Sequence, residues 1–460
     1  MDGRPKGTAL ARDLLLAPPA ECYDPGMKRS PAPDAGEAPR LLYADSKGNI
    51  MDFPGLEAAG SAAGRWRRPQ ASEWIPLPPG SELFLLPGRL PVGFEPQSER
   101  FRVLDRDPRT GGPVSAVAAF VAPAHTQLHT AAYARAGEAP LLPLFAYTAA
   151  GWLGEGFVTA ALRVDQDPRQ DSDRFDAAEL ARRTAERLAA EPANRLLQHL
   201  GRCALGYGCP AAKNLFLGRW EAPLPTSPAC NARCLGCISL QEGSGICATQ
   251  ERIRFVPTAE EVCGVAGPHL ASAPRAVVSF GQGCEGEPLL QDRLLEQAIR
   301  GLRRATSRGT INLNTNASLP EAVLRLRDAG LDSIRVSLNS CRPEYYRKYY
   351  QPKGYSFEEV RRTAGEFKRA GGFVSLNYFV LPGFTDEPAE LAALEAFLGQ
   401  TEADLIQLRN LNIDPEWYLE ALGHLPQEEP LGIRRLMERL RERFPALRFG
   451  YYNPCLDPAA

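Results

Sequence analysis

Residues 309–339 read GTINLNTNASLPEAVLRLRDAGLDSIRVSLN, in which two short apolar runs flank one amphipathic stretch. The same alternation recurs along the C-terminal half of the chain. Six strand-like runs can be counted, at 219–227, 275–281, 309–315, 333–339, 373–381 and 404–410. Apolar runs separated by helical stretches predict repeated βα units around a parallel sheet. We therefore expect an α/β fold with a partial (βα)6 TIM-like barrel, whose chemistry gathers at the C-terminal strand ends.

Composition divides the rest of the chain. Residues 1–40 hold seven prolines and no sustained apolar period, which predicts a mostly disordered tail. Short β-type runs between turn residues predict a β-rich accessory domain over 41–170. Helical spacing of apolar residues predicts a helical connector over 171–215, and 216–455 is then the barrel.

Charge and length exclude several classes of protein. The 460 residues carry 53 basic and 55 acidic side chains, a formal net charge of -2, so no global field calls for a nucleic acid or an anionic membrane as partner. No apolar run is long enough for a membrane span or a signal core. We therefore expect a cytoplasmic protein, in which eleven cysteines favour metal or redox chemistry over disulfides.

The cysteines cluster, and three of them share one loop. Cys230-Asn-Ala-Arg-Cys234-Leu-Gly-Cys237 follows the first predicted strand, and this spacing lets a short loop aim three thiolates at one centre. A closed zinc site needs four tetrahedral ligands, and Cys247 or a histidine is a candidate fourth. A [4Fe-4S] cluster also takes four thiolates, so three leave one iron open. The spacing alone leaves both alternatives standing.

A C-x3-C-x2-C loop after strand one of a partial βα barrel resembles the radical S-adenosylmethionine (SAM) superfamily, over about residues 216–415. The resemblance implies that Cys230, Cys234 and Cys237 hold a [4Fe-4S] cluster whose open iron chelates SAM. It also implies that reduction cleaves SAM to a 5'-deoxyadenosyl radical, which abstracts hydrogen from a substrate. A low-potential electron donor of the ferredoxin or flavodoxin type is the implied partner. One position departs from the family, because Gly236 stands where an aromatic residue often precedes the third cysteine.

A glycine-rich turn follows the second predicted strand. Residues 281–288 read GQGCEGEP, a segment similar to the family's GGEP motif. By that match Gly286 and Glu287 hold the methionine ammonium group, while Glu285 replaces the first glycine. Taken alone, the turn is equally typical of an ordinary strand-to-helix loop.

Polar residues at later strand ends complete the predicted cofactor site. Asn312, Asn314 and Asn316 alternate with apolar residues, so one strand face is polar, as a ligand-binding barrel interior requires. By resemblance Ser337 reaches the cofactor ribose, and Arg409 either anchors a substrate carboxylate or phosphate or pairs with a neighbouring acid. The set beyond the glycine-rich turn is Asn316, Ser337, Asn339, Asn377 and Arg409.

Residues 343–355 (PEYYRKYYQPKGY) are basic and aromatic. They form either a lid over the substrate or, as we prefer, a short helix that packs its tyrosines on the barrel rim while Arg347 and Lys348 face water. The segment does not support nucleic acid as a substrate.

The chain contains further cysteines and histidines that could bind a metal. Four thiols, on Cys203, Cys209, Cys247 and Cys263, are enough for an auxiliary iron–sulfur cluster, although cysteine is often buried for packing alone. Cys284 and Cys341 follow strands two and four, and we interpret both as inert. His125-x3-His129 has helical metal spacing, but the segment is predicted to be β or loop, which argues against a metal there.

The sequence leaves the substrate open among a peptide, a protein and a small molecule. Residues 41–170 either recognise a peptide or cap the barrel over a small molecule. The alternative to an enzyme is a non-catalytic zinc- or iron–sulfur-binding scaffold with a partner-docking β domain. Fold alone does not decide between them.

Overall fold

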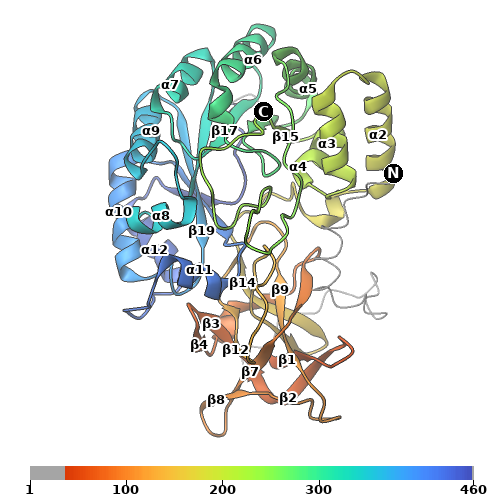
Figure 1. Cartoon of the computed structure of the whole chain (residues 1–460), viewed down its shortest axis with the longest axis vertical. Coiled ribbons are helices and arrows are strands. Elements are labelled where there is room, and N and C mark those ends of the chain that lie inside the picture. The colour runs from red at the N-terminus through yellow and green to blue at the C-terminus, as the bar shows by residue number, and fades with distance from the viewer. Residues whose placement is uncertain (1–36, 458–460) are drawn as a thin grey trace.

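A parallel sheet forms the centre of the larger part of the molecule (Figure 1). The computed structural model describes residues 37–457, so the predicted tail at 1–40 lies almost entirely outside the described residues. The sheet has seven strands in sequential order. They are β15 (Glu221–Leu224), β16 (Val277–Phe280), β17 (Thr310–Thr315), β18 (Ser333–Leu338), β19 (Phe373–Val380), β20 (Leu405–Asn410) and β21 (Arg448–Gly450).

Helices connect these strands and form an outer layer (Figure 1). They are α5 (Ala259–Ser272), α6 (Asp292–Ala305), α7 (Pro320–Ala329), α8 (Pro343–Tyr350), α9 (Phe357–Arg369), α10 (Pro388–Thr401), α11 (Pro415–Leu422) and α12 (Ile433–Arg443). Capping boxes start α5 at Thr258 and α9 at Ser356, where hydroxyl and carboxylate satisfy orphan backbone donors. Among the described residues, no helix combines the length and apolarity that a membrane crossing requires.

The predicted α/β fold with a partial barrel is confirmed, with one strand more than expected. All six predicted strands are present, and β21 adds a seventh, parallel to β20. The sequence pattern missed β21 because three residues are too few to show a period of two. The strand order runs from β15 at one edge to β21 at the other, so the barrel is open.

Polar side chains join the two sides of this open barrel. The Asn453 amide, just after β21, donates to Glu221 Oε1 on β15 at 2.7 Å. Gln407 on β20 donates from Nε2 to Asn453 Oδ1 at 3.0 Å. The polar groups in these contacts are buried but hydrogen-bonded to one another, so burying them costs little free energy.

The N-terminal part is β-rich, as expected. Its main sheet contains β1 (Arg40–Ala44), β2 (Ile50–Ala58), β5 (Trp74–Pro76), β6 (Glu82–Leu86), β7 (Arg89–Glu95), β8 (Arg100–Val103), β9 (Ser115–Phe120), β10 (His125–Gln127), β12 (Tyr133–Arg135), β13 (Ala150–Leu153) and β14 (Gly156–Arg163). A second sheet pairs β3 (Gly60–Ala62) with β4 (Arg65–Arg67) and β11 (Thr130–Ala131). Helices α2 (Ala177–Ala190), α3 (Arg195–Leu205) and α4 (Pro210–Phe216) lead to the barrel.

The β-rich part docks on the C-terminal ends of β19 and β20. Gln127 donates from Nε2 to the Val380 carbonyl at 2.9 Å, and Thr126 donates from Oγ1 to the Leu408 carbonyl at 2.9 Å. Because these carbonyls lie at the strand ends, this part of the chain covers one side of the barrel mouth (Figure 1).

A buried ion pair holds the same interface. Arg89 Nη2 on β7 lies 2.6 Å from Asp414 Oδ2, and each side chain is only 1% exposed. Asp414 Oδ1 also caps the start of α11 by accepting from Glu416 N at 3.0 Å. One carboxylate therefore stabilises both the helix and the contact between the two parts of the chain.

Replacing Arg89 with Met should lower the free energy of unfolding by about 3–5 kcal/mol, because Asp414 would stay buried without its cation. Urea unfolding followed by tryptophan fluorescence measures the loss. The double variant Arg89→Met/Asp414→Asn keeps the helix cap without the orphaned charge, and should regain part of the stability. A single variant as stable as the wild type would contradict this account of the interface.

Candidate active site at the cysteine loop

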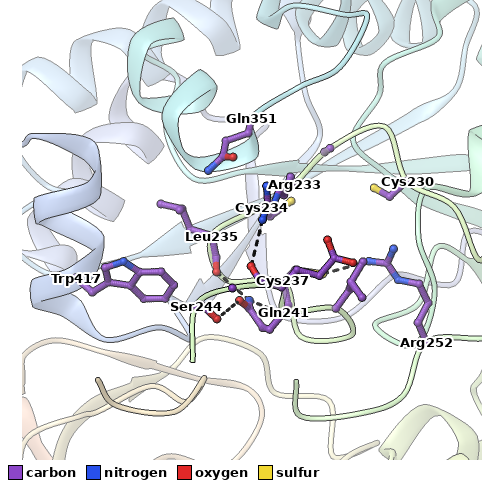
Figure 2. Close-up of a pocket in the computed structure, with 14 residues that line it drawn as sticks. Cys230, Arg233, Cys234, Leu235, Cys237, Gln241, Ser244, Arg252, Gln351 and Trp417 are labelled. Atoms are coloured by element: carbon purple, nitrogen blue, oxygen red, sulfur yellow. Dashed lines mark hydrogen bonds between the residues drawn. The ribbon is translucent and has the colours of Figure 1, made fainter. Parts of the chain in front are cut away.

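Cys230, Cys234 and Cys237 line one pocket of about 250 Å³ (Figure 2). A tetrahedral zinc ion with Zn–S bonds of about 2.3 Å would hold its sulfurs about 3.8 Å apart. Within residues 37–457, only one group of three or more metal-ligating side chains has its ligand atoms within 4.8 Å of one another, and that group does not contain these three cysteines. The loop thiols are thus spread more widely than one zinc ion allows, whereas the thiolates of a cubane bind different irons.

The end of α8 supports the cysteine loop. Arg233 N donates to the Tyr350 carbonyl at 2.8 Å, and Leu235 N donates to the Tyr349 carbonyl at 3.0 Å. All four tyrosines of α8 are buried, whereas Arg347 and Lys348 are exposed. The preferred interpretation of this segment as a short packed helix is confirmed.

The helix also explains why glycine stands at position 236. A Cβ atom there would lie 2.8 Å from the Tyr349 hydroxyl oxygen. An aromatic side chain at 236 would collide with Tyr349, so α8 supplies the aromatic ring beside the third cysteine.

The glycine-rich turn runs alongside the chain that enters the cysteine loop. Gly286 N donates to the Ser227 carbonyl at 2.7 Å, and Glu287 N donates to the Ala229 carbonyl at 2.9 Å. A Cβ on Gly286 would lie 1.9 Å from the Ala229 oxygen, so only glycine permits this approach. The two predicted loops are therefore neighbours.

Glu285 has a structural role that the sequence analysis missed. Its buried carboxylate accepts from the backbone N–H groups of Thr226 and Ser227 at 2.7 and 3.0 Å. It also accepts from Gly281 N and Gln282 N at 2.7 and 2.8 Å. Burial nevertheless raises the pKa of Glu285 to about 7. This carboxylate ties the chain after β15 to the chain after β16, and only its place in the motif hinted at a role.

Glu287 lies in a similar buried position. Its carboxylate accepts from Thr315 Oγ1 at 2.6 Å, Asn316 N at 2.8 Å and Leu289 N at 3.1 Å. Burial raises the pKa of Glu287 to about 7. Three of the roughly four acceptor sites of a carboxylate are therefore used within the protein.

The predicted polar strand-end residues differ in whether their side chains are hydrogen-bonded within the protein. Asn316 donates from Nδ2 to Asn231 Oδ1 at 2.8 Å. Asn339 donates from Nδ2 to the Tyr418 hydroxyl at 3.1 Å, while its buried Oδ1 has no hydrogen-bond partner in the described chain. Ser337 and Asn377 are half-buried partners in the β18–β19 register. They make no side-chain hydrogen bond to the described residues and so remain available for a ligand.

Arg409 has no acidic partner among residues 37–457. Its guanidinium lies over the Tyr451 ring at 3.9 Å, and its buried Nε has no hydrogen-bond partner in the described chain. Burial, together with the neighbouring Arg409, lowers the pKa of Arg335 to about 9. The barrel interior thus holds two neighbouring guanidinium groups. Of the two alternatives for Arg409, pairing with an acid does not occur among the described residues.

Arg252 is a second residue that the sequence analysis missed. It donates from Nη2 to Cys237 Sγ at 3.3 Å and from Nε to Ser239 Oγ at 3.1 Å. Figure 2 places it at the edge of the cysteine pocket. No local motif marks Arg252, because fifteen positions of irregular chain separate it from Cys237.

The four additional thiols are not brought together. Cys247 is exposed, and Cys263 on α5 contacts the Ala298 carbonyl. Cys203 lies instead beside His199 and Cys284.

The two histidines of the His125-x3-His129 spacing have separate partners. His125 Nδ1 faces the Ala122 and Pro123 carbonyls, and His129 Nε2 lies 3.2 Å from Glu73. The structure thus gives His125 and His129 no shared metal-binding arrangement.

Comparisons with known proteins identify the barrel. Residues 224–394 match the family model described as Radical SAM superfamily. The probable GTP 3',8-cyclase of Methanosarcina mazei is 30% identical over 216 residues, which is 46% of this chain and 61% of that protein. The GTP 3',8-cyclase of Aquifex aeolicus is 34% identical over 118 residues, 25% of this chain and 36% of that protein. The chain thus spans 61% and 36% of these two relatives, less than two thirds of either.

Two solved structures are also similar. Streptococcus suis SuiB bound to the precursor peptide SuiA is 16% identical, with a TM-score of 0.36 over 56% of this chain and 53% of that one. Methylornithine synthase (PylB) is 16% identical, with a TM-score of 0.34 over 60% of this chain and 75% of that one. The family-model match falls on the part of the chain that carries the cysteine loop and the glycine-rich turn. Residues 224–394 therefore form a radical SAM domain within this chain.

Proposed function

We propose that the protein is a radical SAM enzyme and that Cys230, Cys234 and Cys237 hold its [4Fe-4S] cluster. The observation that carries the proposal is that three thiols line one pocket beside the glycine-rich turn. When bound, the reduced cluster supplies the electron that cleaves SAM to a 5'-deoxyadenosyl radical, which abstracts hydrogen from the substrate. Purified anaerobically and reduced, the protein should convert SAM to 5'-deoxyadenosine. A reconstituted protein that binds no cluster would overturn the proposal.

The protein's own groups bind and orient the cofactor in this proposal. Glu287 keeps about one free acceptor site for the methionine ammonium group, and Gly286 lets the backbone approach it. Ser337 and Asn377, which are register partners without a side-chain hydrogen bond in the described chain, would contact the ribose. Asn316 and Asn339 would act indirectly, by holding the cysteine loop and α8.

The zinc scaffold is the weaker alternative. Its central requirement is that three sulfurs converge on one ion, and the loop sulfurs are too far apart for that. Its partner-docking β domain is also less favoured, because the β-rich part contacts the barrel mouth through Gln127 and Thr126. A cap over a substrate site accounts for that contact more directly.

We propose a substrate that carries a carboxylate or phosphate group, on either a small molecule or a peptide. Arg335 and Arg409 are like charges inside the barrel, and Arg409 has no carboxylate partner in the described chain. An anion between them would offset the cost of burying both. The GTP named for the curated relatives has such a group.

The proposed partner is a low-potential electron donor of the ferredoxin or flavodoxin type, in the cytoplasm. The cysteine pocket also contains Trp417 and the exposed Leu240, an apolar rim suited to a transient contact. We propose no auxiliary cluster on Cys203, Cys209, Cys247 and Cys263, because their sulfurs do not form one group.

Replacing Cys234 with Ala should abolish the visible absorption of the iron–sulfur cluster and reductive SAM cleavage, because one iron loses its thiolate. Anaerobic spectroscopy and chromatography of 5'-deoxyadenosine measure the two effects. Cys263→Ala is the matched control, since this thiol lies on α5, and it should keep both. Full cleavage activity in the Cys234 variant would contradict the assignment.

Replacing Glu285 with Gln should lower the free energy of unfolding by about 2–4 kcal/mol, because the new amide group faces backbone N–H donors that then lack an acceptor. Cluster content should fall with it, since the cysteine loop loses its tie to the glycine-rich turn. Chemical unfolding and iron analysis test both effects, and Glu321→Gln on the exposed face of α7 is the control. Wild-type stability in Glu285→Gln would refute the role of this carboxylate.

Replacing Arg252 with Ala should make the reduction potential of the cluster more negative, because the guanidinium stabilises the extra negative charge of the reduced state through Cys237. A bond that differs by about 1–2 kcal/mol between redox states corresponds to roughly 40–90 mV. Redox titration followed by electron paramagnetic resonance measures the shift. Arg233→Ala, in the same pocket without a sulfur contact, should leave the potential unchanged, and an equal shift in both variants would refute the specific role.

A further inference from the structure

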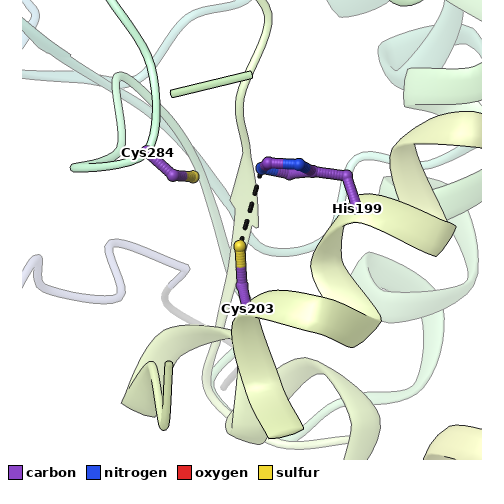
Figure 3. Close-up of side chains that lie close together, drawn as sticks. All are labelled: His199, Cys203 and Cys284. Atoms are coloured by element: carbon purple, nitrogen blue, oxygen red, sulfur yellow. Dashed lines mark hydrogen bonds between the residues drawn. The ribbon is translucent and has the colours of Figure 1, made fainter. Parts of the chain in front are cut away.

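A second cluster of metal-binding side chains lies outside the cysteine pocket. His199 and Cys203 on α3 face Cys284 in the loop after β16 (Figure 3). Their three ligand atoms all lie within 4.8 Å of one another. Each residue is nearly buried, with 5%, 3% and 6% of its surface exposed.

The positions of His199 and Cys203 follow from helix geometry. Residues four apart project from the same face of an α-helix, so both side chains point toward the barrel. Cys284 reaches them from the loop, whose backbone is held by Ile253 N donating to the Cys284 carbonyl at 2.7 Å. Three ligands from two separate elements thus converge on one point.

The measured separation matches a mononuclear ion. His199 Nε2 lies 3.5 Å from Cys203 Sγ. A tetrahedral zinc ion with Zn–S of about 2.3 Å and Zn–N of about 2.05 Å would hold sulfur and nitrogen about 3.6 Å apart. The group is too compact for thiolates that bind different irons of a cubane.

The surroundings give the imidazole no better partner. Its described contacts are the Cys203 sulfur, the Phe255 ring at a centroid distance of 6.5 Å, and Arg202 at 3.5 Å from Nδ1. Sulfur is a weak hydrogen-bond acceptor, so a buried imidazole gains little from it. Arg202 is exposed and is free to move away when Nδ1 carries the proton that metal binding at Nε2 requires.

We propose that His199, Cys203 and Cys284 bind a zinc ion that fastens the glycine-rich turn to α3. Two thiolates and one imidazole are the donor set that zinc prefers among common divalent ions. Cys209, whose N–H donates to the Cys203 carbonyl at 3.0 Å, is the neighbouring protein group for the fourth position. Because Cys284 adjoins Glu285, the ion would hold the turn at a second point, next to its contact with the chain before the cysteine loop.

Metal analysis of the full-length chain tests this site independently of radical chemistry. A variant with Cys230, Cys234 and Cys237 all replaced by Ser cannot hold the proposed cluster, yet it should still contain about one zinc per chain. Adding Cys203→Ser and Cys284→Ser should remove that zinc, whereas adding Cys263→Ser instead should not. No zinc in the first variant, or zinc that survives loss of Cys203 and Cys284, would overturn the proposal. Failure of SAM cleavage alone would not bear on it.

A second experiment uses the wild-type chain, in case the double substitution prevents folding. It measures how far zinc protects the thiols from alkylation. After chelation, in a urea concentration low enough to keep the chain folded but high enough to open it transiently, iodoacetamide should modify the buried Cys203 and Cys284, and added zinc should slow their modification without changing that of the exposed Cys247. Peptide mass spectrometry reports each site. Equal rates with and without zinc at Cys203 and Cys284 would also overturn the site.

Discussion

Four backbone N–H groups converge on the buried Glu285 carboxylate, and the arrangement of the candidate active site depends on this contact. Two donors come from Thr226 and Ser227 before the cysteine loop, and two from Gly281 and Gln282 after β16. A buried carboxylate with this many donors is costly to disrupt, because each donor would otherwise be buried without a partner. The carboxylate thus converts two adjacent loops into one rigid unit. The pocket that contains the three cysteines is built on that unit.

The β-rich part gives the barrel mouth a second constraint. Gln127 and Thr126 donate to strand-end carbonyls, and the Arg89–Asp414 pair is buried with them. A buried ion pair adds little net stability over an apolar contact, but it penalises any alternative docking that separates the charges. We interpret it as a device that fixes how the cap sits on the barrel.

The sequence predicted features that depend on local periodicity and missed those that depend on long-range contacts. Alternating apolar runs located the six longer strands, since burial on both faces leaves a continuous apolar signal. The spacing of Cys230, Cys234 and Cys237 was equally readable. By contrast, Arg252 reaches Cys237 through an irregular loop, and Cys284 meets His199 from a distant segment. Asn339 illustrates the same limit, because its strand-end position did not reveal that its Nδ2 group pairs with Tyr418 on α11.

Consecutive residues of the glycine-rich turn serve different neighbours, which explains its composition. Cys284 faces α3, Glu285 binds the chain before the cysteine loop, and Glu287 binds the end of β17. A segment that contacts three elements within four residues must approach other backbone closely, and Gly286 meets the Ala229 carbonyl where no side chain fits. The family's first glycine can become Glu285 because the side chain at that position points away from the close approach, into a ring of backbone donors. The departure from the family pattern therefore adds an anchor while leaving the essential glycine in place.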